Sequence, residues 1–445
     1  MNGVGDRRRC IPHVCPQADD GPNPFAHKLP YARVVRQSSP AAAARSPIAN
    51  LGPASRAGRR NGAIQPVAAL ILLPPRSAAA NTATGWLEAG QELIAERHRE
   101  TLEHLGAAAS IVRQPLDGRS FGQRMRELVG EITAPRLGRR TGLIVLGGGS
   151  MPLAGPADLA AFLATARSDS AAALANNAYS ADAIAVSDAR LLLNVPDLPS
   201  DNALPRWLAE HAGVPVGDLR DRPWLSFDVD SPIDLLLLGR HQGCPADLAT
   251  LAVEVGDANP EVAGALAGVA GTLLDRRAEL VVSGRTSSSA LAWLERNTVC
   301  RVRALVEERG LKASAALALG KHGTDPNREL AADPPAARAD ARQRPPRSVL
   351  GMALDARGPG ALGAILAELG DAAVVDTRVL LAHRLGAHDS HWPKLADRLA
   401  SDLLRPGDIA DAWLRDLTTA ALGAPIPVLL GGHTLVGPGL TLLGG

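Results

Sequence analysis

The chain is poor in aromatic residues and has almost no net charge. Phe, Trp and Tyr make up 3% of its 445 residues, so it lacks the stacking surfaces on which single-stranded nucleic acids bind. Lys and Arg number 47 against 46 Asp and Glu, and a formal net charge of +1 excludes the strong positive field of a protein that binds nucleic acid or anionic membranes. We therefore expect small-molecule partners, and neither a nucleic acid nor a membrane.

Cysteine and long apolar runs are also scarce. Cys10, Cys15, Cys244 and Cys300 match neither a paired zinc-binding motif nor a disulfide framework. No uncharged apolar run reaches the roughly 18–20 residues that span a bilayer, and Arg7–Arg9 are not followed by the apolar segment of a secretion signal. These features predict a reducing, cytoplasmic location.

The first 64 residues differ in composition from the rest. They contain ten Lys and Arg against three Asp and Glu, and their apolar residues follow no helical or strand period. Such a segment buries too little apolar surface to offset its chain entropy. We predict a disordered basic N-terminal extension over 1–64. A start codon assigned too far upstream and a basic docking arm are the two further interpretations.

Strand and helix patterns alternate from residue 65 onward. Apolar runs of strand length at 67–73 and 141–148 are followed by helical patterns at 88–106 and 156–166. Strands that alternate with helices of 10–15 residues are typical of crossover units around a mostly parallel sheet. We predict an α/β domain over 65–245, in which a mostly parallel mixed sheet has helices on both faces.

A second α/β domain is predicted over 246–445. Its strand patterns include 279–284 and 371–377, each close to a helical pattern. The stretch 321–347 is polar and Pro-rich without any period, which predicts a mobile insertion. The alternating Arg and Glu residues of 300–310 are predicted to form the solvated, ion-paired face of a helix.

A glycine-rich turn follows the strand predicted at 141–148. Gly147, Gly148 and Gly149 allow a backbone to approach a ligand closely, and a helix with Pro and Asp in its first turn comes next. A tight strand-to-helix turn explains the three glycines equally well. Because ligands of open parallel sheets bind beyond the carboxyl ends of the strands, we predict that this turn, with Ser150, contacts a substrate.

Two aspartates lie at the end of a strand predicted over 224–230. Asp228 and Asp230 are separated by one residue, so in a strand their side chains lie on one face and can share a divalent cation. Ser231 and Asp234 are explained by the capping of the following helix, which leaves the pair without a structural role. We predict that Asp228 and Asp230 are catalytic residues that bind Mg²⁺.

Two segments within 67–238 match a known pattern. The central strand runs into GGSMPLAGPADL, and a later segment reads DVDSPIDL. The chain here resembles the GT-A-like, MobA-type nucleotidyltransferases, and among them the 2-phospholactate guanylyltransferases, which have Asp-x-Pro-Leu and Asp-x-Asp-Thr/Ser-Pro-x-Asp-Leu at these places. The resemblance implies a nucleotide-diphospho-sugar transferase-like fold and transfer of a nucleotidyl group from a nucleoside triphosphate to a small phosphorylated or acidic metabolite.

Two departures from the family pattern bear on the mechanism. The metal-binding acid of the central turn is missing, because Gly149, Ser150 and Met151 precede Pro152. The first strand leads into LPPRSAAANTATGW, where only Arg76 is charged, and not into a basic Gly-rich phosphate loop. Either Arg76 acts as a catalytic residue and other acids compensate, or the chain is a non-catalytic nucleotide- or metabolite-binding protein on that fold.

Further polar residues are candidates for substrate binding. They gather in 176–182, 199–206 and 284–289, where amides, hydroxyls and charged groups can bind a base, a ribose or a small acid, although caps and turns have the same composition. A third alternative places the activity in the second domain, with Arg285, Thr286 and His433 around an anion. The predicted binding residues are Asn176, Asn177, Asp182, Asp201, Asn202, Arg206, Arg285 and Thr286.

Overall fold

The computed structural model describes residues 65–77, 82–115, 117–134, 140–198, 201–308, 346–387 and 389–444. These residues belong to one compact unit, Ala63–Gly445. The predicted N-terminal extension over 1–64 lies outside the described residues. So does the predicted insertion over 321–347, apart from its last two residues.

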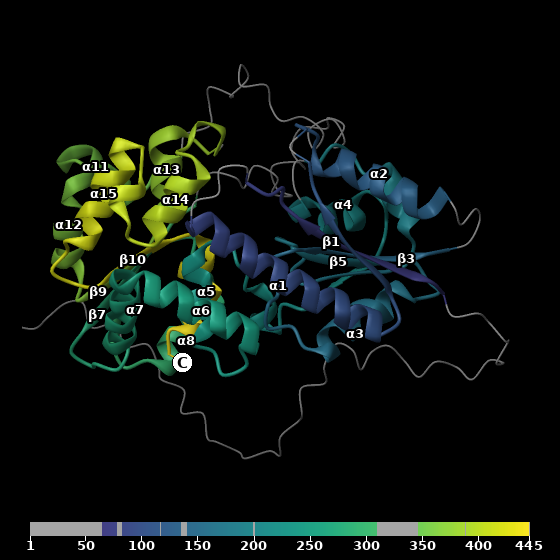
Figure 1. Cartoon of the computed structure of the whole chain (residues 1–445), viewed down its shortest axis with the longest axis horizontal. Helices are drawn as coiled ribbons and strands as arrows, with labels where there is room; N and C mark the ends of the chain where they lie inside the picture. Colours follow the sequence, from purple (N-terminus) through teal and green to yellow (C-terminus); the bar gives the residue numbers. More distant parts are fainter. Residues whose placement is uncertain are drawn as a thin grey trace, which may run out of the picture. The chain divides into compact units, whose positions relative to one another are not determined.

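The first sheet has six strands in the order β2-β1-β3-β5-β4-β6 (Figure 1). β1 pairs in parallel with β2 and β3, and β4 pairs in parallel with β6, whereas β5 is antiparallel to β3 and β4. The predicted mixed, mostly parallel sheet is therefore confirmed. The strands are β1 Val67–Leu73, β2 Ala108–Arg113, β3 Gly142–Gly147, β4 Ala173–Ala175, β5 Ala183–Val186 and β6 Val216–Asp218.

Alternation along β1 supplies apolar side chains to both faces of this sheet. Ile71 and Leu73 belong to the core that α1 and α3 cover, whereas Leu70 and Leu72 belong to the core that α2 and α4 cover. Helices on both faces are the arrangement that buried parallel strands require. These helices are α1 Thr82–His104, α2 Phe121–Thr133, α3 Pro156–Ala166 and α4 Leu204–Glu210.

The second sheet has four parallel strands in the order β10-β9-β7-β8. β9 and β10 are buried along their whole length and β7 along nearly all of it, which accounts for their continuous apolar sequences. The strands are β7 Glu279–Gly284, β8 Arg301–Val306, β9 Ala372–Asp376 and β10 Val428–Gly431. The α/β architecture with two sheets is thus confirmed.

The second region is rich in helices. In the described part of the chain from residue 232 onward, the α-helices are α5 Pro232–Gly239, α6 Ala246–Ala258, α7 Pro260–Thr272, α8 Ser288–Asn297, α11 Val349–Arg357, α12 Leu362–Leu369, α13 Thr377–Leu385, α14 Leu395–Asp402, α15 Ala412–Leu422 and α16 His433–Val436. Within the described residues, no single helix has the length and apolarity to cross a membrane. One pair of segments, α11 and Pro359–Leu369, is long and apolar enough when taken together, but it is bent by 112°.

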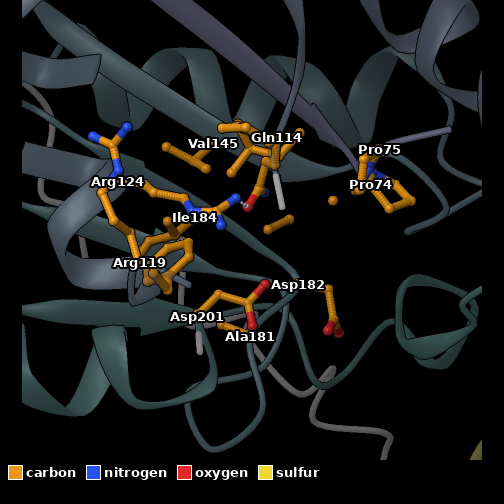
Figure 2. A pocket seen from close by; sticks show the side chains of 15 residues that line it. Pro74, Pro75, Gln114, Arg119, Arg124, Val145, Ala181, Asp182, Ile184 and Asp201 are labelled. Carbon is orange, nitrogen blue, oxygen red and sulfur yellow. Dashed lines mark hydrogen bonds between the residues drawn. The ribbon is translucent and has the colours of Figure 1, made fainter. Parts of the chain in front are cut away.

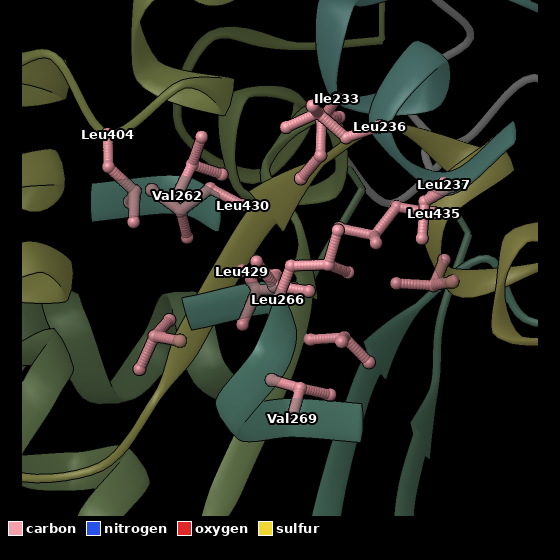
Figure 3. Close-up of a cluster of buried hydrophobic side chains, with 14 of the residues drawn as sticks. Ile233, Leu236, Leu237, Val262, Leu266, Val269, Leu404, Leu429, Leu430 and Leu435 are labelled. Carbon is pink, nitrogen blue, oxygen red and sulfur yellow. The ribbon is translucent and has the colours of Figure 1, made fainter. Parts of the chain in front are cut away.

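One hydrophobic core connects α5 with the second sheet. Ile233 and Leu237 of α5 pack in the same cluster as Val262 and Leu266 of α7 and Leu430 of β10 (Figure 3). Residues of α1 also contribute to this cluster. The residues on both sides of the predicted boundary at 245 therefore share one core.

The strand predicted over 224–230 is wrong. Pro223–Ser226 form a 3-10 turn, which suits the fixed φ of Pro223 at its start. Asp228 then pairs with Ser150 through an isolated antiparallel bridge. The segment is extended at Asp228 but gains only this one bridge, because the turn on one side and α5 on the other limit its length.

The helix predicted within 300–310 is also wrong, because Arg301–Val306 form β8 at the edge of the second sheet. Arg303 pairs with Glu279 of the neighbouring β7 at 2.9 Å, and not with Glu307 or Glu308. Parallel pairing with β7 satisfies the backbone groups of this segment that face β7.

Candidate functional site

A cavity of about 440 Å³ opens at the carboxyl ends of the first strands of the six-stranded sheet. Its apolar wall includes Pro74 and Pro75 after β1, Pro115 after β2, and Phe121 at the start of α2. Asp182 and Asp201 line it as well (Figure 2). A cavity with largely apolar walls and a few polar groups at this edge of an open sheet is a typical small-molecule site.

Two arginines of the cavity wall were not predicted from the sequence. Arg124 donates to Asp117 at 2.8 Å and to Gln114 at 3.1 Å, and Arg119 donates to Asp117 at 2.8 Å and also bonds Glu127. Figure 2 shows both guanidinium groups on one side of the cavity, apart from the carboxylate of Asp182. Their only signal in the sequence was a position just after β2, at the start of an amphipathic helix.

Four carboxylates interact with one another, those of Asp182 and Asp201, which line the cavity, and those of Asp228 and Asp230, which do not. Burial, together with the charges of Asp201 and Asp230, raises the pKa of Asp182 to about 7. Burial raises the pKa of Asp201 to about 6, with a further contribution from Asp230. Burial and the charges of Asp182 and Asp230 also raise the pKa of Asp228 well above its usual value. The cluster therefore holds more negative charge than the protein around it stabilises.

Asn176 places Asp182 in this cluster. Its side-chain oxygen accepts hydrogen bonds from the backbone nitrogens of Asp182, at 3.0 Å, and Ala183, at 3.2 Å, and its amide nitrogen donates to the Leu225 carbonyl at 3.1 Å. Each group of the Asn176 side chain is thus used within the protein. Asn176 was predicted to bind substrate, and its observed contacts are those of a residue that holds Asp182.

Asp228 is joined to Asp182 although 46 positions separate them in the sequence. A side-chain hydrogen bond connects the two carboxyl groups. Asp228 is only 7% exposed, and its Oδ1 atom has no hydrogen-bond partner among the described residues. A buried, unsatisfied carboxylate oxygen is costly in a folded protein, so it indicates a place where a ligand supplies the missing interaction.

Asp230 lies at the exposed edge of the same cluster. Its side chain is 58% exposed, and its Oδ2 atom is 3.9 Å from Nδ1 of His433. Its backbone nitrogen donates to Oδ2 of Asp234 at 3.0 Å, so Asp234, an acid in the first turn of α5, bonds the residue before the N-cap Ser231. Ser231 does not cap α5 with its side chain, because its hydroxyl instead donates to Asp402 at 2.7 Å.

The glycines of the predicted turn serve mainly the packing of the chain. A Cβ atom on Gly148 would lie 2.2 Å from Cδ2 of Leu73, and one on Gly149 would lie 2.7 Å from the carbonyl oxygen of Val229. Gly147 alone of the three lines the cavity. Ser150 is 3% exposed, and its hydroxyl donates to the Gly147 carbonyl at 2.8 Å.

Arg76 and three residues predicted to bind substrate instead contact other groups of the protein. Arg76 pairs with Glu92 at 3.0 Å on the surface, and Arg206 pairs with Glu210 at 3.3 Å along α4. The side-chain oxygen of Asn177 accepts from the backbone of Tyr179 at 2.9 Å, and that of Asn202 accepts from the hydroxyl of Ser180 at 2.7 Å. None of Arg76, Asn177, Asn202 and Arg206 is among the residues that line the described cavity.

Arg285 and Thr286 lie at the carboxyl end of the second sheet. Arg285 makes two hydrogen bonds to the buried carboxylate of Asp376, at 2.6 and 3.1 Å. Burial opposes the ionisation of Asp376, but Arg285 and Arg378 outweigh it and lower its pKa. The Arg285 guanidinium therefore serves a protein carboxylate, and Oγ1 of Thr286 is buried without a hydrogen-bond partner among the described residues.

The raised pKa values predict how stability changes with pH. The pKa of Asp201 is about 6 in the folded chain against 3.8 for the free group, so the folded state binds more protons between these values and becomes less stable as the pH rises. In buffer with a chelator, Asp201→Asn should remove about 2 kcal/mol of the loss between pH 4.5 and 7.5. Urea unfolding at both pH values measures this, with the exposed Asp169→Asn as control. An unchanged loss in Asp201→Asn would contradict the prediction.

The donor set determines which cations the cluster fits. Among the described residues, no three His, Cys, Asp or Glu side chains are grouped as a ready-made metal cage. Mg²⁺ does not need one, since it is commonly bound by one or two carboxylates, several waters and the phosphates of a substrate. The buried Oδ1 of Asp228 and the exposed carboxylate of Asp230 fit that pattern.

No protein-family model and no curated protein sequence matches this chain.

Proposed function

We propose that this chain is a Mg²⁺-dependent nucleotidyltransferase-like enzyme with a nucleotide-diphospho-sugar transferase-like fold. It transfers a nucleotidyl group from a nucleoside triphosphate to a small phosphorylated or acidic metabolite. The observation that carries the proposal is the buried Asp228, whose Oδ1 atom lacks a partner among the described residues and whose carboxyl group is joined to Asp182 at the cavity.

The acidic cluster supports a cation-dependent reaction. Asp228 and Asp230 are the residues that would hold Mg²⁺, with Asp182 next to them. When bound, Mg²⁺ supplies neutralisation of the negative charge on phosphate oxygens. Without a cation, these carboxylates would repel a triphosphate, so the residues alone do not bind one well.

The cavity supports the binding of a planar group. Phe121 and the prolines at 74, 75 and 115 provide apolar walls that exclude water, and Gln114 and Asp201 provide hydrogen-bonding groups for polar edges. In this proposal the base lies in the cavity and the phosphates point toward Asp182 and Asp228. The chain's contribution is then positioning, which together with charge neutralisation supplies most of the catalysis in phosphoryl transfer.

A non-catalytic nucleotide- or metabolite-binding protein is the second candidate. The observation that favours it is the pairing of the cations: Arg76 bonds Glu92, and Arg119 and Arg124 both bond Asp117. Paired guanidinium groups neutralise less of the charge that develops on a transferring phosphoryl group. This candidate lacks the chemistry of the first, and it need not bind a nucleoside triphosphate.

Thermal unfolding with each nucleoside triphosphate, with Mg²⁺ or with EDTA, tests the binding step. A ligand that binds only the native state raises Tm, because it increases the free energy of unfolding. The increase is about 2.7 kcal/mol when the ligand concentration is 100 times Kd. We expect at least one triphosphate to raise Tm only with Mg²⁺, and pyrophosphate to be released when a phosphorylated or carboxylic acid acceptor is added. A shift without pyrophosphate would support a nucleotide-binding protein. No shift with any triphosphate would contradict the transferase and leave only a metabolite-binding protein.

A further inference from the structure

Helix α1 contacts both segments that form the bridge at Asp228. Nε2 of His98 donates to the carbonyl of Ser150 at 2.9 Å, and the side-chain amide of Gln91 donates to the carbonyl of Val229 at 3.0 Å. Gln91 and His98 are seven positions apart, which is about two turns of a helix, so both side chains lie on one face of α1.

The two hydrogen bonds act on the residues beside Asp228. Ser150 is the bridge partner of Asp228, and Val229 follows Asp228 directly. The bridge itself consists of hydrogen bonds from Met151 to the Phe227 carbonyl, at 3.1 Å, and from Val229 to the Gly149 carbonyl, at 2.9 Å. Without these contacts the short extended segment has no neighbouring strand to fix it.

The chain is closely packed at Gly149, beside the Gln91 hydrogen bond, and His98 is buried. A Cβ atom on Gly149 would lie 2.7 Å from the carbonyl oxygen of Val229 and 3.1 Å from Cγ of Gln91. His98 is 3% exposed, and burial lowers its pKa to about 4, so its ring is neutral near pH 7. The carbonyl of Ser150 can only accept, which places the proton of the neutral ring on Nε2.

We propose that Gln91 and His98 are positioning residues, which hold from α1 the backbone on both sides of Asp228 and so keep its carboxylate in the acidic cluster. Neither side chain touches substrate in this proposal. The inference rests on the proposed cation site, and it adds a specific claim: the affinity of the site depends on two donors that belong to a different element of the fold. Replacing a residue that orients a metal ligand commonly lowers metal affinity by about 10–100-fold.

Binding of Mn²⁺ to the full chain, measured by electron paramagnetic resonance and by calorimetry, tests the proposal. We expect His98→Phe and Gln91→Met, which keep the bulk but remove the donor, to weaken Mn²⁺ binding about tenfold. His98→Gln keeps a nitrogen donor at the end of the side chain and should restore most of the affinity. His104→Phe is the matched control, because His104 is an exposed histidine on the same helix whose ring bonds the Glu100 carbonyl, and it should bind as the unmodified chain does.

The outcomes separate the two levels of the argument. If Asp228→Asn loses Mn²⁺ while His98→Phe and Gln91→Met bind it normally, the positioning role is wrong and the cation site stands. Equal weakening by His98→Gln and His98→Phe would show that packing, and not the donor, matters. If the unmodified chain binds no Mn²⁺, the proposed function and this inference both fail. Gln91→Met involves only a half-buried side chain, so it remains informative if His98→Phe does not fold.

Discussion

Asp228→Asn is expected to make the protein more stable while it removes cation binding. Burial and neighbouring carboxylates raise the pKa of Asp228 in the folded chain. At any pH above 3.8, the ordinary pKa of this group, the folded chain therefore either keeps a proton on Asp228 or holds a buried negative charge. Asparagine has no such cost. We expect a higher free energy of unfolding at pH 7.5 in EDTA, and a smaller gain at pH 4.5. Mn²⁺ affinity should fall by more than about tenfold.

Urea unfolding at the two pH values and Mn²⁺ titration measure this pair of effects. Asp221→Asn is the control, because Asp221 is an exposed carboxylate seven positions earlier in the chain, and it should change neither quantity. A gain in stability with a loss of binding is the pattern of a functional residue held at an energetic cost. A destabilised Asp228→Asn with intact Mn²⁺ binding would mean that the carboxylate is structural, and the proposed site would be wrong.

Asp402→Asn is expected to produce the largest loss of stability. The Asp402 side chain is fully buried and pairs with the nearly buried Arg378, with Oδ2 of Asp402 2.6 Å from Nη2 of Arg378. The same oxygen accepts from the Ser231 hydroxyl at 2.7 Å, so it also holds the start of α5. Asparagine would leave the guanidinium of Arg378 buried with its main counter-charge gone. We expect a loss of about 3–5 kcal/mol, measured by urea unfolding.

Asp408→Asn is the matched control for Asp402→Asn. Asp408 pairs with Arg405 at 2.6 Å, but both side chains are more than one third exposed. Such exposed pairs contribute at most about 1 kcal/mol to stability. The double replacement Arg378→Met with Asp402→Leu should cost less than Asp402→Asn alone, because it removes both charges. If Asp402→Asn cost no more than Asp408→Asn, the buried pair would not be a major source of stability.

The sequence alone determined the elements whose pattern is local. The continuous apolar runs of β1, β7 and β9, and the Pro-initiated apolar helices α3 and α5, are visible in a window of about ten residues. The alternation of such elements was enough to predict two α/β regions and a mostly parallel first sheet. Strands of three residues, such as β4 and β6, carry too little pattern to be found this way.

The tertiary structure alone decided how the candidate site is assembled. The sequence indicated Asp228 and Asp182 separately, but their shared hydrogen bond and raised pKa values arise because β5 lies beside β3 and the bridge at Ser150 brings Asp228 to the same edge. Arg76, chosen as the only charge after β1, instead pairs with Glu92 of α1. Charge and burial act through space over a few ångströms, whereas sequence patterns report the neighbours along the chain, so pairing between distant segments had to be seen in three dimensions.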